Sequence, residues 1–244
     1  MRLFTVLLLL ALTSTTLFSG PVKKTTMEQD TIQTSGGPLT ITFIGHGTLM
    51  LQWNGKTIQV DPWTKLADYA KLPKADLVLI THEHQDHYDT AALAATSTAA
   101  TEYLLNASLR EKFGKGHILH NGDSTTMLGI RIDAVPAYNT TEERAKFHPK
   151  GRDNGFVLTI GGVRLYIAGD TENTPEMEAL KDVDIAFLPM NQPYTMTPAQ
   201  VAHAAKAFRP KILYPYHTGE TNVAELAPLL ADEKGIELRV RSMK

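Results

Sequence analysis

The chain has 244 residues, of which 43% are hydrophobic and 20% charged, a balance typical of a folded globular protein. Its formal net charge of −2 argues against a protein held to nucleic acid by bulk charge, since phosphate binding needs clustered cations. The chain has no cysteine, which excludes disulfides, thiolate metal ligands and a cysteine nucleophile. Any metal chemistry therefore has to use other side chains, among them nine histidines.

Residues 1–20 are predicted to be a signal peptide. Arg2 is followed by an apolar run over 3–12 and by small residues near Ser19 and Gly20. The run is too short to span a bilayer comfortably, so we expect a periplasmic or secreted protein with no stable membrane insertion after cleavage; an uncleaved N-terminal anchor is the alternative. Residues 21–38 are polar and are predicted to be a flexible lead-in, with 39–244 as one domain.

The first half of the domain is predicted to begin with strands. Alternating residues predict a strand over 39–44, and the Asn54-Gly55 turn joins strands 48–53 and 57–60. The continuous apolar run 76–81 is typical of a strand buried on both faces. Ala-rich residues 90–98 predict a helix, and a second short helix over 106–113 ends at Gly114.

The second half again combines a hairpin with alternating strands and helices. Strands are predicted over 117–121, 125–128, 130–136, 156–160, 163–168, 184–188, 211–214 and 237–240. Helices are predicted over 174–181, 197–208 and 222–233. Two hairpins, each followed by strand–helix alternation, predict an α/β protein with two packed sheets and helices outside.

The chemistry is concentrated in residues 82–89, which contain three histidines and three acids and directly follow the apolar strand. In an extended segment, His82, His84 and Asp86 share one side, and His87 points elsewhere and can serve a second centre. Imidazole and carboxylate suit a divalent ion such as zinc when no thiolate is present. A solvated loop that happens to be rich in histidine is the alternative.

This segment resembles the signature of the metallo-β-lactamase superfamily, and other pieces follow in that family's order. Gly45-His46-Gly47-Thr48 comes early, Gly169-Asp170 follows the second hairpin, and Pro215-Tyr216-His217 follows strand 211–214. The resemblance covers nearly all of 39–244 and is greatest to the L-ascorbate-6-phosphate lactonase-like branch. It implies a four-layer αββα sandwich with a metal site at one edge.

The resemblance also implies roles for single residues. His82 and His84 would bind a first ion, a second ion would be bound by Asp86, His87 and His217, and Asp170 would bridge the two. Asp86 and Asp170 are the expected catalytic residues. Taken alone, Asp170 also fits a turn residue and His217 an ordinary strand-end histidine. Two further residues stay open: Asp61 as a turn former or as support for a ligand histidine, and His46 as a substrate contact or a packing residue.

The sequence departs from the family pattern at the third ligand of the first ion. Asn139 stands where the family usually has a histidine, and an amide oxygen is a poor substitute for imidazole on zinc. His148 lies nine residues further on and can fold back to complete this site; the alternative is an exposed loop histidine. His117, His120 and His203 receive no role, and Tyr194, Met196 and Trp63 fit either a pocket or the core.

The expected activity is that of a metallohydrolase with two divalent ions, zinc first and manganese or iron as alternatives. An activated hydroxide would attack an ester, lactone or phosphoester, and β-lactamase activity is less favoured because of Asn139. Basic residues Arg144, Lys146, Lys150 and Arg152 would suit an anionic small-molecule substrate, or are simply solvated. A periplasmic binding protein without turnover and a mononuclear-iron redox enzyme are the alternatives.

Overall fold

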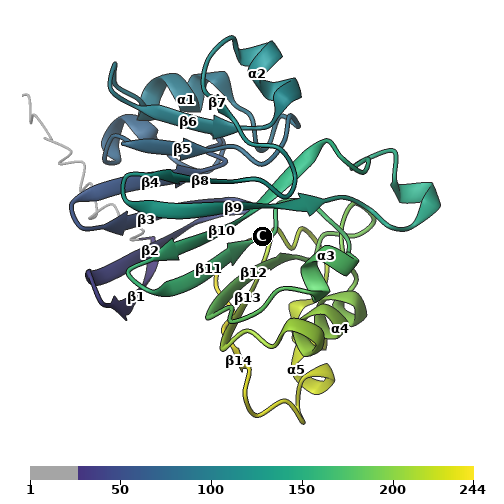
Figure 1. The fold of residues 1–244 in the computed structure, drawn as a ribbon. Helices are drawn as coiled ribbons and strands as arrows, with labels where there is room; N and C mark the ends of the chain where they lie inside the picture. Colours follow the sequence, from purple (N-terminus) through teal and green to yellow (C-terminus); the bar gives the residue numbers. More distant parts are fainter. Residues whose placement is uncertain (1–26) are drawn as a thin grey trace, which may run out of the picture.

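The computed structural model describes residues 27–244, and Figure 1 shows two sheets packed face to face with helices on both outer faces. The αββα sandwich expected from the sequence is confirmed. The predicted signal peptide, residues 1–20, lies outside the described residues, as does the start of the predicted lead-in. Within 27–244, no helix has the length and apolar character needed to cross a membrane.

The N-terminal sheet has seven strands in sequential order. They are β1 (Glu28–Thr34), β2 (Gly37–Gly45), β3 (Thr48–Trp53), β4 (Lys56–Val60), β5 (Leu77–Leu79), β6 (Glu102–Leu105) and β7 (His117–Ile118). Strands β1 to β4 pair antiparallel, and β4 to β7 pair parallel.

The C-terminal sheet repeats this plan with strands β8 to β14, also in sequential order. They are β8 (Ser124–Met127), β9 (Ile130–Ala137), β10 (Asp153–Ile160), β11 (Val163–Ile167), β12 (Ile185–Pro189), β13 (Ile212–Tyr216) and β14 (Glu237–Leu238). Strands β8 to β11 are antiparallel and β11 to β14 are parallel. Each half of the domain is therefore an antiparallel meander followed by parallel strands.

Helices connect the parallel strands of both sheets, as parallel pairing requires long crossovers. On the N-terminal sheet these are η1 (Tyr69–Lys71), α1 (Thr90–Thr96) and α2 (Ala107–Phe113). On the C-terminal sheet they are α3 (Pro175–Glu178), α4 (Pro198–Phe208), η3 (Val223–Glu225) and α5 (Leu226–Leu229), and η2 (Glu142–Arg144) lies in the β9–β10 loop. Residues Thr197 and Gln200 form a capping box at the start of α4.

The main core lies between the two sheets, where alternate residues of facing strands point inward. Phe187 of β12 is fully buried there and stacks on Tyr214 of β13, with ring centroids 4.9 Å apart. Phe43 of β2 contacts both rings from the opposite sheet, at 6.2 and 5.0 Å. This aromatic contact holds the two sheets together beneath the edge that carries the histidines.

The predicted lead-in 21–38 is wrong from residue 28 onward, because β1 is part of the sheet and pairs along its whole length with β2. Strand β1 is polar and half-exposed, so its composition looks like that of a linker. Long-range contacts hold it in place: Asp30 accepts hydrogen bonds from Arg241 at 2.7 and 2.8 Å and from the Tyr214 hydroxyl.

One further local prediction fails, and one strand was missed. The predicted helix over 222–233 is only η3 and the single turn α5, since Pro228 lies inside the segment and cannot continue a helical hydrogen-bond pattern. Strand β6 was not predicted, because its apolar residues lie in a short run between two helices. It is defined by parallel pairing with β5 and β7.

The inter-sheet aromatic contact gives a stability prediction. Phe187→Ala leaves a cavity between the sheets, so we expect the free energy of unfolding in urea to fall by about 3–5 kcal/mol. Ile118→Ala is the control, because Ile118 is 45% exposed and its truncation should cost less than about 0.5 kcal/mol. Equal losses in the two variants would contradict this account of the core.

Candidate metal centre

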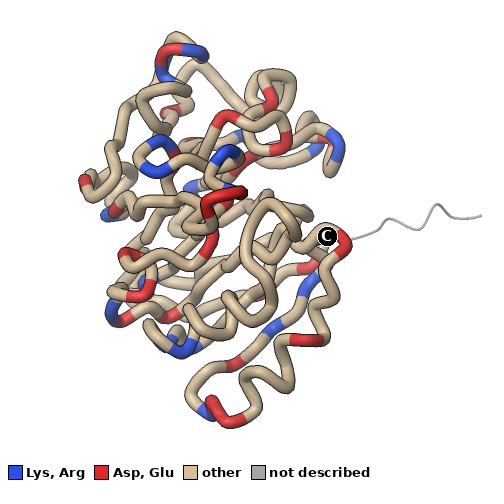
Figure 2. The backbone as a smooth tube through the Cα atoms, turned by 90° about the vertical axis from the view of Figure 1, so that its right-hand side faces the viewer, with Lys and Arg blue, Asp and Glu red and all other residues tan. Residues whose placement is uncertain are grey.

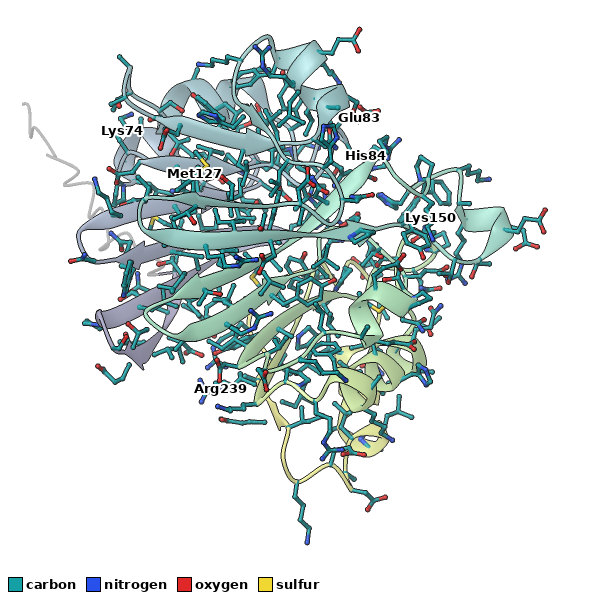
Figure 3. All side chains as sticks on the ribbon, in the orientation of Figure 1. Lys74, Glu83, His84, Met127, Lys150 and Arg239 are labelled. Atoms are coloured by element: carbon teal, nitrogen blue, oxygen red, sulfur yellow. The ribbon has the colours of Figure 1, made fainter. Side chains whose placement is uncertain are left out.

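The candidate metal centre lies at one edge of the sandwich, where loops leave the ends of strands from both sheets. His82, His84, Asp86 and His87 follow β5, and His46 follows β2. Asp170 follows β11, His217 follows β13, and His148 comes from the β9–β10 loop. Figure 3 places His84 and Lys150, the latter on that same loop, at this edge. The sheets therefore bring together residues from five separate parts of the chain.

The first group consists of His82, His84 and His148. Their ligand atoms all lie within 4.8 Å of one another, and His82 Nε2 is 3.1 Å from His84 Nδ1. A zinc ion holds its nitrogen ligands at about 2.0–2.1 Å, so three nitrogens at this spacing can share one ion.

The second group consists of His46, Asp86, His87 and His217, again with ligand atoms within 4.8 Å of one another. Asp86 Oδ2 is at its centre, 3.0 Å from His46 Nε2, 3.5 Å from His217 Nε2 and 3.7 Å from His87 Nε2. This group contains the three residues that the resemblance assigns to a second ion, together with His46.

Asp170 lies between the two groups. Its Oδ1 is 3.5 Å from His87 Nε2, and its Oδ2 is 3.5 Å from His148 Nε2 and 3.4 Å from His217 Nε2. Asp170 Oδ1, His87 Nε2 and both ring nitrogens of His217 are buried without a hydrogen-bond partner. Buried polar atoms without partners are costly, and their convergence fits a bound cation.

A turn separates the candidate ligands within the His-rich segment, residues 82–89. The backbone N–H groups of His87 and Tyr88 both donate to the carbonyl of His84, at 3.0 and 2.8 Å. The predicted extended conformation of 82–86 is therefore wrong beyond His84. The turn directs Asp86 toward the second group and leaves His82 and His84 in the first.

Asp61 orients His87. Its Oδ2 is 2.8 Å from His87 Nδ1, and its two oxygens accept from the backbone N–H and the hydroxyl of Thr81 at 2.8 and 2.6 Å. A proton held on Nδ1 leaves the Nε2 lone pair free for a metal. The structure thus favours the reading of Asp61 as support for a ligand histidine, although its φ of 44° also makes it a turn residue.

Asp153 does the same for His148 and was not predicted. Its fully buried carboxylate lies 3.3 Å from His148 Nδ1 and is held by Arg152 at 2.6 and 2.8 Å. In the sequence Asp153 follows several charged residues and looks like another solvated charge. Its burial at the start of β10 distinguishes it, and only the tertiary structure shows that burial.

The structure brings His148, and not Asn139, to His82 and His84. The Asn139 side chain donates instead to the carbonyls of Tyr194 at 2.7 Å and Arg144 at 3.1 Å. Its backbone N–H donates to the carbonyl of His148 at 2.9 Å. Asn139 therefore closes the loop that returns His148 to the edge.

His46 and His217 have strained backbones that bring their rings together. Their φ angles are 51° and 47°, in the left-handed region, and their ring centroids are 3.7 Å apart. The residue after His46 has to be glycine, because a Cβ on Gly47 would lie 2.8 Å from the His87 ring. The His46 ring also contacts the ring of Trp63, which therefore lies beside the site. Met196 belongs to the hydrophobic core.

The electrostatics of the cluster favour a bound cation. Burial lowers the pKa of His87, but the carboxylates of Asp170 and Asp61 outweigh it and raise that pKa to about 10. Burial raises the pKa of Asp170, yet the neighbouring histidines hold it below its usual value. Burial and the other histidines keep the pKa of His82 well below its usual value. Asp170 and His82 are thus in the forms that bind metals, ionised carboxylate and neutral imidazole, and at His87 the same carboxylates that attract a proton would attract a metal cation in its place.

An αββα sandwich with converging histidines and carboxylates at one edge defines a metallohydrolase class, and comparisons with known proteins agree. The family model described as "Beta-lactamase superfamily domain" matches residues 40–217. This chain belongs to the metallo-β-lactamase superfamily and is a metal-dependent hydrolase of that fold.

Among curated relatives, the UPF0173 metal-dependent hydrolase of Anoxybacillus flavithermus is 32% identical over 77% of this chain and 89% of its own length. A crystal structure from Parabacteroides distasonis, of a candidate metal-dependent hydrolase, is 54% identical, with a TM-score of 0.88 over 90% of this chain and 100% of that one. Igni18, a metallo hydrolase of Ignicoccus hospitalis, shares the fold at 24% identity, with a TM-score of 0.70 over 83% of this chain and 94% of that one.

The contact between Asp61 and His87 gives a prediction for metal affinity. In Asp61→Asn an amide N–H can replace the acceptor that holds the proton on His87 Nδ1. We expect metal affinity, measured by competition with a chromogenic chelator, to fall about 10–100-fold. Asp76→Asn is the control, because within residues 27–244 the Asp76 carboxylate accepts from Thr57 and Lys56 and belongs to neither group of histidines. Unchanged affinity in Asp61→Asn would contradict the orienting role.

Proposed function

We propose that this metal-dependent hydrolase binds two divalent ions and cleaves an ester, lactone or phosphoester in a small-molecule substrate. The observation that supports this most directly is the position of Asp170, whose two oxygens lie within 3.5 Å of histidines from both groups. Zinc is the first choice of metal, with manganese or iron as alternatives, because the donors are only imidazole and carboxylate.

His82, His84 and His148 would hold one ion, the second would be held by Asp86, His87 and His217, and Asp170 would contact both. When bound, such ions would supply an activated water as nucleophile and would stabilise the negative charge that develops on the substrate. The carboxylate of Asp170 orients the attacking water. Asp86 holds the His46 ring beside the second group through the 3.0 Å contact.

A cavity of about 220 Å³ opens over these groups and suits part of a small molecule. We propose a lactone or phosphoester before a β-lactam, because the third histidine of the first group comes from a different sequence position than in the family pattern. We also propose a periplasmic or secreted setting from the composition of residues 1–20, with no nucleic-acid partner and no stable membrane insertion after cleavage.

The location proposal has a direct test. We expect the mature protein to begin close to residue 20, as measured by N-terminal sequencing after expression of the full chain with its own leader. The protein should appear in the periplasmic or culture fraction. A protein that keeps Met1 and stays with the cytoplasm would contradict the prediction.

The two-ion proposal predicts metal content and turnover together. The purified protein should bind two ions per chain by elemental analysis, and chelation should abolish turnover of lactone and phosphodiester probes. Asp170→Asn should lower kcat by at least about 100-fold, because the group that orients the nucleophile is lost. His148→Ala should reduce the metal content to about one ion per chain.

His203→Ala is the matched control, since His203 is an exposed histidine that pairs with Glu178 and belongs to neither group of the described site. It should keep both ions and full activity. Tight metal binding without turnover across a broad panel of substrates would support the alternative of a binding protein. One bound iron with oxygen-dependent activity would support the redox alternative.

A further inference from the structure

The metal cavity has a second wall that the metal groups do not supply. Beside its histidines and aspartates, the cavity is lined by Phe147, Asn191 and Tyr194. Phe147 comes from the β9–β10 loop and Tyr194 from the β12–α4 loop. Tyr194 is 45% exposed, which makes it one of the few large apolar side chains exposed within the described residues. Its ring lies edge-to-face with that of Phe147, with centroids 5.1 Å apart.

Hydrogen bonds hold this aromatic pair at the cavity. Asn139 bridges the two loops, because its amide donates to the carbonyls of both Tyr194 and Arg144. The Tyr194 loop is closed by its own turn, in which the N–H groups of Tyr194 and Thr195 donate to Asn191 at 2.8 and 2.9 Å. The rings are thus held in place before any substrate arrives, which reduces the ordering cost of binding.

The buried carboxylate of Glu172 fixes the other side of the same loop. It accepts from the Thr141 backbone at 2.6 Å and from the Arg144 guanidinium at 2.8 Å. Because Arg144 is bound to both Glu172 and the Asn139 bridge, the loop that carries Phe147 is tied to the body of the domain at two points.

Three of the four basic side chains of this loop are paired with acids. Arg144 pairs with Glu172 at 2.8 Å, Lys150 with Glu176 at 3.4 Å and Arg152 with Asp153 at 2.6 Å. Lys146 lies over the Phe147 ring, 5.1 Å from its centroid. Figure 2 likewise shows basic and acidic segments interleaved along the chain. The most distinctive free surface beside the metal groups is therefore aromatic.

We propose that Phe147 and Tyr194 recognise a planar apolar group, an aryl ring, attached next to the bond that is cleaved. Their rings border the same cavity as Asp86 and Asp170, so a substrate held by the metal groups would place its neighbouring substituent against them. Ring–ring contacts at 4.5–7 Å favour aryl over alkyl substituents. This inference rests on the proposed function, and Asn139 acts in it as a positioning residue.

The test compares phenylphosphonate with methylphosphonate on the metal-loaded protein by titration calorimetry. Both ligands offer the same phosphonate to the metal groups and differ only in the ring. We expect the protein to bind phenylphosphonate at least about 10-fold more tightly. Tyr194→Ala and Phe147→Ala should each lower this ratio several-fold without changing the affinity for methylphosphonate.

Tyr194→Phe is the matched control, because it keeps the ring and should keep the ratio. Asn139→Ala should lower the ratio through displacement of Tyr194, and elemental analysis should show unchanged metal content in the Tyr194 and Phe147 variants. Equal affinity for the two phosphonates, failure to bind either one, or a ratio that survives both alanine substitutions would overturn the proposal.

A kinetic comparison separates this inference from the proposed function. Methyl p-nitrophenyl phosphate and bis(p-nitrophenyl) phosphate share a leaving group, and they differ in the other substituent. The Tyr194→Ala substitution should lower kcat/KM for bis(p-nitrophenyl) phosphate more than kcat/KM for methyl p-nitrophenyl phosphate. Absence of turnover together with a preserved phosphonate ratio would refute the hydrolase proposal and leave the recognition surface standing.

Discussion

The burial of Asp170 among histidines is the constraint on which the rest of the site depends. Its side chain is 4% exposed, and one of its oxygens has no hydrogen-bond partner. A buried carboxylate is costly unless positive charge or donors compensate it, and here the compensation comes from imidazoles of three separate loops. Two of those imidazoles have an acidic partner of their own, which is Asp61 for His87 and Asp153 for His148. The site is thus two layers deep, and the outer acids set the ring orientation of the inner histidines.

Two sheets of the same plan bring the histidines around Asp170. Each half of the domain is an antiparallel meander followed by parallel strands, and the two sheets pack through Phe43, Phe187 and Tyr214. Loops that follow β5, β11 and β13 then converge at one edge. The backbones at His46, Asp61 and His217 have positive φ angles, a strain that the packed sheets beneath them compensate. The same edge places the aromatic pair next to the metal groups, so the proposed chemistry and the proposed recognition surface share one cavity.

Much of the fold could be predicted because its signals are local. Local signals fix the backbone conformation around them, and the elements predicted from them are present in the structure. These signals are the Asn54-Gly55 and Gly161-Gly162 turns, the apolar run before His82 and the Thr197 cap. Strand β1 escaped prediction because its stability comes from Arg241 and Tyr214, about two hundred residues away. The helix predicted over 222–233 failed for a local reason, the ring of Pro228.

The sequence by itself determined the class of chemistry: histidines and acids at fixed spacing, without cysteine, indicate a metal centre of imidazole and carboxylate. The tertiary structure alone decided which residues complete it. His148 joins His82 and His84 because Asn139 folds the intervening loop back, and Asp153 supports His148 because β10 buries it. Burial and convergence across loops are properties of the packed chain, and no spacing in the sequence encodes them directly. That is why the candidate ligand histidines after β5 and a supporting role for Asp61 could be proposed from the sequence, whereas the contact of Asp153 with His148 could not.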